Sequence, residues 1–185
     1  AKEKYPLLRV DDVVGAVFLP RDGALNPIDV TRALSIGARN DGVRIFEHTK
    51  VTGVTVQNGR AVGVRTEKGD IRAEYVVNCA GLWGREVGAM AGVAVPLHAA
   101  EHFYVVTEPV PGLPKNTPVL REPGRCIYVK EDAGKLLIGC FEPVAKPWGM
   151  KGIPEDFSFG TLPDDFDHFQ PHLESALHRI PALEK

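Results

Sequence analysis

Apolar residues recur along the chain with two different periods, which separate helices from strands. After Asn26-Pro27, a favourable N-cap and first-turn pair, apolar residues repeat at helical spacing as far as Ala38. Asn40-Asp41-Gly42 then supplies a stop signal. This pattern predicts a helix over residues 27–41.

Short strands joined by tight turns are predicted around this helix. The period becomes two from residues 43–45 onward, and a β-meander is expected from Val51 to Val77. Asn58-Gly59 within it is the strongest short hairpin signal in the chain. An earlier apolar run, Val13 to Leu19, is also predicted to be a strand.

Small residues crowd the turn that follows the meander. A helix is predicted from Leu82 to Ala91, yet Gly81, Gly84 and Gly88 are poor helix formers. Glycines at such a place permit close approach of a ligand or of another backbone. The alternative is tight helix–sheet packing alone, and the residues leave both open.

The second half of the chain is richer in strands. A strand is predicted over His102–Thr107, and a hairpin over Cys126–Lys130 and Lys135–Phe141. No periodicity survives between Glu142 and Pro163, which predicts a long loop. An amphipathic helix is predicted from about Asp165 to His178.

Composition and charge exclude several classes of protein. The 185 residues are 44% hydrophobic and 25% charged, which is typical of a globular chain and excludes wholesale disorder. The formal net charge of −2 argues against nucleic acid as a partner. No apolar run approaches the roughly 18 residues of a membrane span, so no membrane partner is expected.

The common catalytic and phosphate-binding motifs are absent from these residues. No G-x-G-x-x-G, G-x-x-x-x-G-K-[ST], H-E-x-x-H or G-x-S-x-G occurs. His168 and His172 are spaced to share a helix face, but such a pair on an amphipathic helix is more often solvated than metal-binding. No metal site is therefore expected. On residues alone the chain is an α/β protein of unknown activity.

Four stretches carry a resemblance to a known family. Val76–Trp83 resembles the flavin-contacting strand and turn of the D-amino-acid-oxidase-like FAD-dependent oxidoreductases. Pro96–Glu108, Asp22–Pro27 and Gly139–Pro143 are similar to the dimethylglycine/sarcosine dehydrogenase branch. The resemblance covers nearly the whole chain, in order.

The resemblance implies an α+β fold with a mixed, largely antiparallel sheet and covering helices. It places residues 49–95 in an FAD-binding domain and residues 96–185 in a substrate domain. Residues 1–48 are expected to be divided discontinuously between the domains, with helix 27–41 bridging the FAD and substrate parts. The family's dinucleotide-binding motif precedes the matching region, so the chain is expected to be an internal fragment that is inactive and binds FAD weakly or not at all.

Four residues match the family's FAD contacts. Val51 matches a position whose backbone contacts the adenine end, and Ala80, Gly81 and Trp83 match the turn against the flavin nucleotide. Small residues allow the backbone to approach the cofactor, and Trp83 offers a flat apolar wall. Trp83 as a core aromatic is the alternative.

His102 and Tyr128 match the family's active-site histidine and tyrosine. Oxidation of an N-methyl amine needs a neutral nitrogen, and a histidine can take its proton. Tyr128 is expected to hydrogen-bond the substrate carboxylate or His102. On residues alone, the alternative for His102 is a histidine of the strand whose ring is satisfied by hydrogen bonds. Arg121 and Arg125 lie near enough in sequence to hold a carboxylate, but exposed arginine is the commoner outcome.

These expectations define an FAD-dependent amine dehydrogenase or oxidase acting on a small dimethylglycine- or sarcosine-like substrate. One alternative is a non-catalytic β-rich binding or assembly module. Another is a related flavoenzyme for a different amino acid or glycerol 3-phosphate. The expected compartment is the bacterial cytoplasm or the mitochondrial matrix, and the truncated chain is expected to self-associate through exposed apolar surface.

Overall fold

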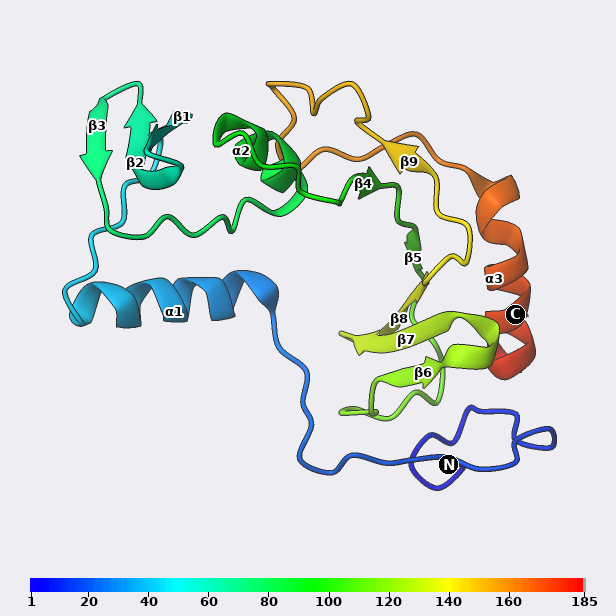
Figure 1. Ribbon diagram of the computed structural model, residues 1–185. Coiled ribbons are helices and arrows are strands. Elements are labelled where there is room, and N and C mark those ends of the chain that lie inside the picture. The colour runs from blue at the N-terminus through cyan, green and yellow to red at the C-terminus, as the bar shows by residue number, and fades with distance from the viewer. Residues whose placement is uncertain (185) are drawn as a thin grey trace. The chain divides into compact units, whose positions relative to one another are not determined.

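The computed structural model describes residues 1–184, which form two compact units (Figure 1). Unit 1 contains Ala1–Ala24, Glu101–Lys146 and the chain from Thr161 onward. Unit 2 contains Leu25–Ala100 and Pro147–Gly160. All the strand pairings in the described residues are antiparallel, and helices accompany them. The expected α+β class is thus confirmed.

Unit 1 is built on a four-stranded sheet in the order β5-β8-β7-β6. Its strands are β5 (Tyr104–Val106), β6 (Leu120–Glu122), β7 (Ile127–Asp132) and β8 (Lys135–Cys140). The predicted hairpin is confirmed as β7 and β8, which turn at Ala133 and Gly134, both with positive φ. The strand expected over 102–107 is shorter, and β6, which precedes the short 3-10 helix Pro123–Arg125, was not predicted.

The core of unit 1 lies between this sheet and helix α3 (Phe166–Arg179), which contacts β7 and β8 (Figure 1). The hairpin contributes every second residue to it, as expected for a sheet with one covered face. The predicted amphipathic helix is confirmed, and its buried residues are Phe169, Ala176 and Arg179. The members of the core cluster are Tyr5, Leu8, Ile127, Val129, Leu136, Ile138, Ala176 and Ile180. A 3-10 turn over Pro181–Glu184 follows the helix.

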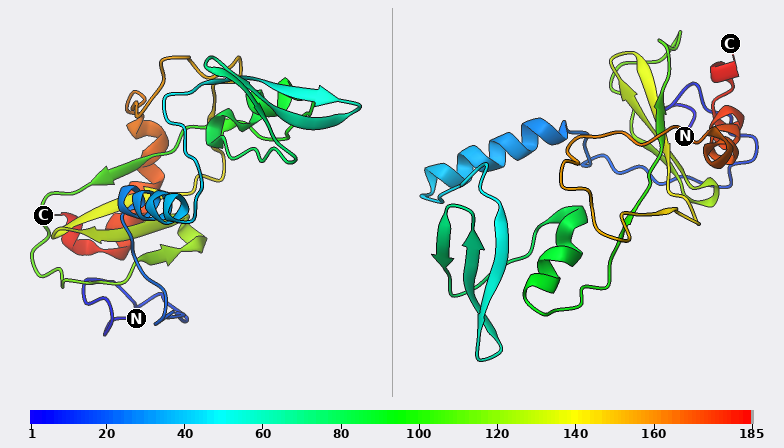
Figure 2. Two further views of the ribbon diagram at one scale, coloured as in Figure 1. Left: turned by 90° about the vertical axis from the view of Figure 1, so that its left-hand side faces the viewer. Right: turned by 90° about the horizontal axis from the view of Figure 1, so that it is seen from above.

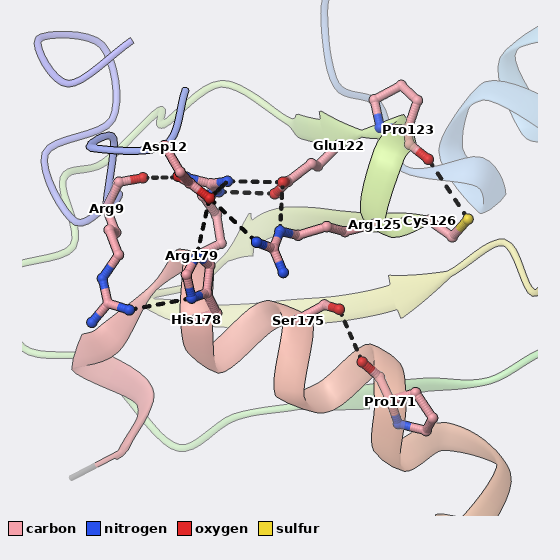
Figure 3. Close-up of polar contacts among 10 residues, drawn as sticks. All are labelled: Arg9, Asp12, Glu122, Pro123, Arg125, Cys126, Pro171, Ser175, His178 and Arg179. Carbon is pink, nitrogen blue, oxygen red and sulfur yellow. Dashed lines mark hydrogen bonds and ion pairs between the residues drawn. The ribbon is translucent and has the colours of Figure 1, made fainter. Parts of the chain in front are cut away.

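A buried arginine joins the N-terminal segment to the sheet and to α3 (Figure 3). The Arg179 guanidinium, whose residue is only 4% exposed, donates to both carboxylate oxygens of Glu122 and both of Asp12. Arg125 pairs with the same two carboxylates, and His178 Nε2 lies 3.0 Å from Asp12 Oδ2. We call these five residues the Arg179 cluster. Hydrogen bonds from Arg179 and His178 hold the pKa of Asp12 well below its ordinary value.

Unit 2 contains a three-stranded meander of β1 (Val51–Gln57), β2 (Arg60–Thr66) and β3 (Gly69–Arg72). Figure 2 shows β1 and β2 as a twisted ribbon. Asn58 and Gly59 both have positive φ, as the tight hairpin turn requires, so this prediction is confirmed. The meander ends at Arg72, so its predicted continuation to Val77 is wrong.

Helix α1 (Pro27–Asn40) begins as predicted at Asn26, whose side chain accepts hydrogen bonds from Ile28 N at 2.9 Å and Asp29 N at 3.3 Å. A 3-10 turn (Gly81–Trp83) leads into α2 (Gly84–Met90), which is shorter than predicted. Strands β4 (Ala99–Ala100) and β9 (Pro147–Trp148) form a small sheet.

Two predicted strands are absent from the described chain. Val13–Leu19 and residues 43–45 form no ladder, and Val14 and Val17 are almost fully exposed. An apolar run becomes a strand only where a neighbouring strand satisfies its backbone groups. Neither run has such a neighbour here.

Candidate functional site

The sheet of unit 1 brings the two predicted active-site residues together. His102 precedes β5 and Tyr128 lies in β7, with β8 between these strands. Tyr128 is paired in register with Gly139 of β8, and Tyr104 is paired with the same glycine from the other side. The order of strands therefore places residues 26 positions apart in sequence within reach of each other.

The Tyr128 ring crosses β8 because residue 139 has no side chain. A Cβ atom at Gly139 would lie 2.1 Å from Tyr128 Cζ, closer than atoms can approach. The Tyr128 hydroxyl lies 3.3 Å from His102 Nε2, and the two rings are stacked with centroids 6.1 Å apart. The His102 side chain is 45% exposed, so one side of the pair is open. Burial and nearby acidic groups raise the pKa of Tyr128, which keeps its hydroxyl protonated.

A carboxylate that the sequence analysis did not single out lies on the other side of His102. Glu142 Oε2 is 3.4 Å from His102 Nδ1, while its side chain is only 4% exposed. Its Oε1 accepts the backbone N–H of Phe103 at 3.3 Å and the thiol of Cys140 at 3.2 Å. The sequence does carry a signal for its burial. Leu136, Ile138 and Cys140 are buried at every second position along β8, and Glu142 is the next position in that series.

Hydrogen bonds decide the charge of Glu142. Burial alone would raise its pKa, but hydrogen bonds from backbone, Cys140 and His102 outweigh burial and the pKa lies below its ordinary value. Burial and the same carboxylate raise the pKa of the Cys140 thiol to about 12. Glu142 is therefore ionised and Cys140 is a neutral donor at neutral pH.

Phe141 completes the surroundings of the pair. Its ring centroid lies 5.6 Å from that of His102 and 5.4 Å from that of Tyr128. The Arg121 guanidinium lies over Phe141 at 4.2 Å and is exposed. Arg125, by contrast, is engaged by Asp12 and Glu122. Of the two arginines considered from the sequence, only Arg121 lies beside the pair.

The residues matched to FAD contacts lie in unit 2. Val51 begins β1 and is half-buried, while Ala80, Gly81 and Trp83 belong to the turn before α2. Asn78 holds this turn by accepting from Ala80 N at 3.2 Å and donating to Gly84 O at 2.8 Å. Apart from the adjoining residues of the chain, no heavy atom lies within 4 Å of a Cβ placed on Gly81.

These features fit a flat cofactor. Gly81 has a φ of +54°, which favours glycine, and its backbone faces open space. Trp83 is 40% exposed, so its indole is not enclosed in a core. Gly88 instead permits tight packing, because a Cβ there would lie 2.3 Å from Val95 Cγ2. Open backbone and tight packing therefore occur at different glycines of one segment.

Residues 1–184 contain no cluster of three or more His, Cys, Asp or Glu suited to a metal ion. Within the same residues no helix is both long and apolar enough to cross a membrane. In unit 1 a histidine lies between a tyrosine hydroxyl and a buried carboxylate.

The comparisons with known proteins show the family to which the chain belongs. The model of the family "FAD dependent oxidoreductase" (DAO) matches residues 1–185. The chain belongs to this family, and the resemblance expected from the motifs is confirmed.

Two curated relatives match the whole chain or nearly all of it. One is the mitochondrial pyruvate dehydrogenase phosphatase regulatory subunit of Mus musculus, 41% identical over 98% of this chain. Another is the mitochondrial sarcosine dehydrogenase of Mus musculus, 39% identical over 100% of this chain. The chain spans 21% and 20% of their respective lengths.

A solved structure supports the fold. L-proline dehydrogenase from P. horikoshii matches 99% of this chain with a TM-score of 0.76 and 25% sequence identity. The match covers 46% of that chain. The chain therefore has a fold similar to that of this dehydrogenase over nearly its whole length.

Proposed function

We propose that this sequence forms part of a longer FAD-dependent enzyme that oxidises an N-methylated amino acid such as sarcosine or dimethylglycine. The observation that carries the proposal is the His102–Tyr128 pair, with Nε2 and the hydroxyl 3.3 Å apart on one open side of the unit 1 sheet. The 39% identity to a sarcosine dehydrogenase supports the substrate class.

The pair suits the protonation chemistry of this reaction. An amino-acid amine is protonated in water, and it must lose that proton before its lone pair can assist departure of a hydride from the adjacent carbon. His102 accepts the proton, and the Tyr128 hydroxyl positions the ring or the substrate through a hydrogen bond. When bound, FAD supplies the two-electron acceptor for the hydride.

The proposed FAD contacts are Val51, Ala80, Gly81 and Trp83. The open backbone at Gly81 and the exposed Trp83 indole support this assignment. Arg121, exposed beside Phe141, is the available cation for a substrate carboxylate.

The test of the catalytic proposal is His102→Ala in a full-length protein that carries this sequence. With FAD bound and oxygen excluded, the variant is expected to reduce flavin at least about 100-fold more slowly on mixing with sarcosine or dimethylglycine. His98→Ala, another exposed histidine, is the matched control and should leave the rate unchanged. An unchanged rate in the His102 variant, with flavin still bound, overturns the catalytic role of His102.

A second function is a non-catalytic binding or assembly module. The 41% identity to a protein named as a regulatory subunit favours it. A module would show either no bound FAD or no flavin reduction with N-methylated amino acids, other amino acids or glycerol 3-phosphate. Flavin reduction by another amino acid or by glycerol 3-phosphate, but not by N-methylated amino acids, would instead indicate a related flavoenzyme with that substrate.

For the 185 residues by themselves we propose no turnover and at most weak FAD binding, because they contain no phosphate-cradling G-x-G-x-x-G. Exposed apolar side chains such as Val14, Val17 and Val77 favour self-association of this piece. We place the whole protein in the bacterial cytoplasm or the mitochondrial matrix. Stoichiometric flavin absorbance in the purified 185-residue chain would contradict the binding statement, and gel filtration tests the self-association.

A further inference from the structure

The contacts of Glu142 determine which nitrogen of His102 carries the proton. Glu142 receives hydrogen bonds from Phe103 N–H and the Cys140 thiol, and an ionised carboxylate can only accept. Its 3.4 Å contact with His102 Nδ1 is therefore a hydrogen bond only when Nδ1 carries hydrogen. In a neutral imidazole, Nε2 is then the bare nitrogen, and it lies 3.3 Å from the Tyr128 hydroxyl.

We propose that Glu142 is a positioning residue that holds His102 in the tautomer with Nδ1 protonated and Nε2 bare. The bare Nε2, on the side of Tyr128, is the atom that accepts the substrate's proton. This inference deepens the proposed function and rests on it, because it assigns a role that acts only through His102.

The position of Glu142 fits this role better than a role in the core alone. Its side chain is 4% exposed, yet one oxygen is directed to a histidine that is 45% exposed. Phe103 N–H and the Cys140 thiol both contact Oε1, which leaves Oε2 for the imidazole. Burying a carboxylate is costly, and an apolar residue at this place would leave only the Phe103 N–H and the weakly donating Cys140 thiol without this acceptor.

The test is a double-mutant cycle in the full-length, FAD-loaded protein. Flavin reduction by sarcosine or dimethylglycine is followed without oxygen in the wild type, Glu142→Ala, His102→Ala and the double variant. Glu142→Ala is expected to lower the limiting rate at least about tenfold, with substrate Kd changed less than about threefold. In the His102→Ala background the same change should alter the rate less than about twofold.

Two further variants distinguish a loss of catalysis from a loss of folding. Glu142→Gln keeps the size and an acceptor for Phe103 N–H but removes the charge, and it should retain full flavin content with a rate between those of wild type and Glu142→Ala. Glu108→Gln, at a side chain that is 94% exposed, is the matched control and should behave as wild type.

The possible results separate the two proposals. An equal effect of Glu142→Ala in both backgrounds, or no effect of Glu142→Gln and Glu142→Ala, overturns the positioning role while the role of His102 stands. A wild-type rate in His102→Ala overturns the proton-accepting role of His102, and the positioning role with it. No flavin reduction in the wild type overturns the proposed function itself.

Discussion

Gly139 has a role at the site although it has no side chain to contribute. Its missing Cβ leaves the space that the Tyr128 ring occupies, and the ring thereby reaches His102 across a whole strand. The neighbouring residues of β8 are buried, so this glycine cannot shift without disturbing the core. The geometry of the pair therefore depends on a residue that takes no part in the chemistry.

Gly139→Ala is expected to separate Tyr128 from His102 and to destabilise unit 1. The added methyl group would lie 2.1 Å from Tyr128 Cζ, and overpacking of this kind costs about 1–3 kcal/mol. Chemical denaturation measures the loss, and flavin reduction in the full-length protein should slow as well. Gly124→Ala is the control, because nothing lies within 4 Å of a Cβ there. Equal stability of both variants would contradict the packing argument.

At the scale of elements, the Arg179 cluster connects the N-terminal segment, β6 and α3. Arg179→Met keeps the length of the side chain but leaves Asp12 and Glu122 without their buried partner. Arg125 still pairs with both carboxylates and the Asp12 side chain is 35% exposed, so the loss of Arg179 is expected to lower the free energy of unfolding by about 1–3 kcal/mol. Thermal and urea unfolding measure this, with exposed Arg21→Met as the control. A change below about 0.5 kcal/mol would show that the cluster contributes little.

The same cluster predicts sensitivity to acid. The pKa of Asp12 is lower in the folded chain than in the unfolded chain, because Arg179 and His178 donate to its carboxylate. Its stabilising contribution is therefore complete above the ordinary aspartate pKa of about 4, and is lost as the pH falls further. Unfolding followed between neutral pH and about pH 2 should show this loss. Asp12→Asn should show a smaller loss over the same range, and an identical pH dependence would contradict the account.

Local patterns predicted some elements well and others not at all. The cap at Asn26 and the Asn58-Gly59 turn depend on neighbouring residues only, and both were found where predicted. The Val13–Leu19 strand failed because a ladder depends on a partner far away in sequence. For the same reason the crossing of Tyr128 over Gly139 and the contact of Glu142 with His102 could not be predicted, since both follow from the order β5-β8-β7.

At the scale of the whole molecule, the chain divides into two units with different proposed tasks. Unit 1 holds the His102–Tyr128 pair with Glu142, and unit 2 holds the residues matched to FAD contacts. Helix α1 of unit 2 has no buried residue, although its apolar stripe is typical of a packed helix. The chain belongs to the FAD-dependent oxidoreductase family and spans about a fifth of the length of its curated relatives.

The central claim is that the protein carrying this sequence removes a hydride from an N-methylated amino acid. The direct measurement is anaerobic mixing of the full-length, FAD-containing protein with sarcosine or dimethylglycine, while the flavin absorbance is recorded. We expect the absorbance of oxidised flavin to be bleached in a single phase that saturates with amine concentration. Bound FAD that stays oxidised at saturating concentrations of both amines would contradict the claim.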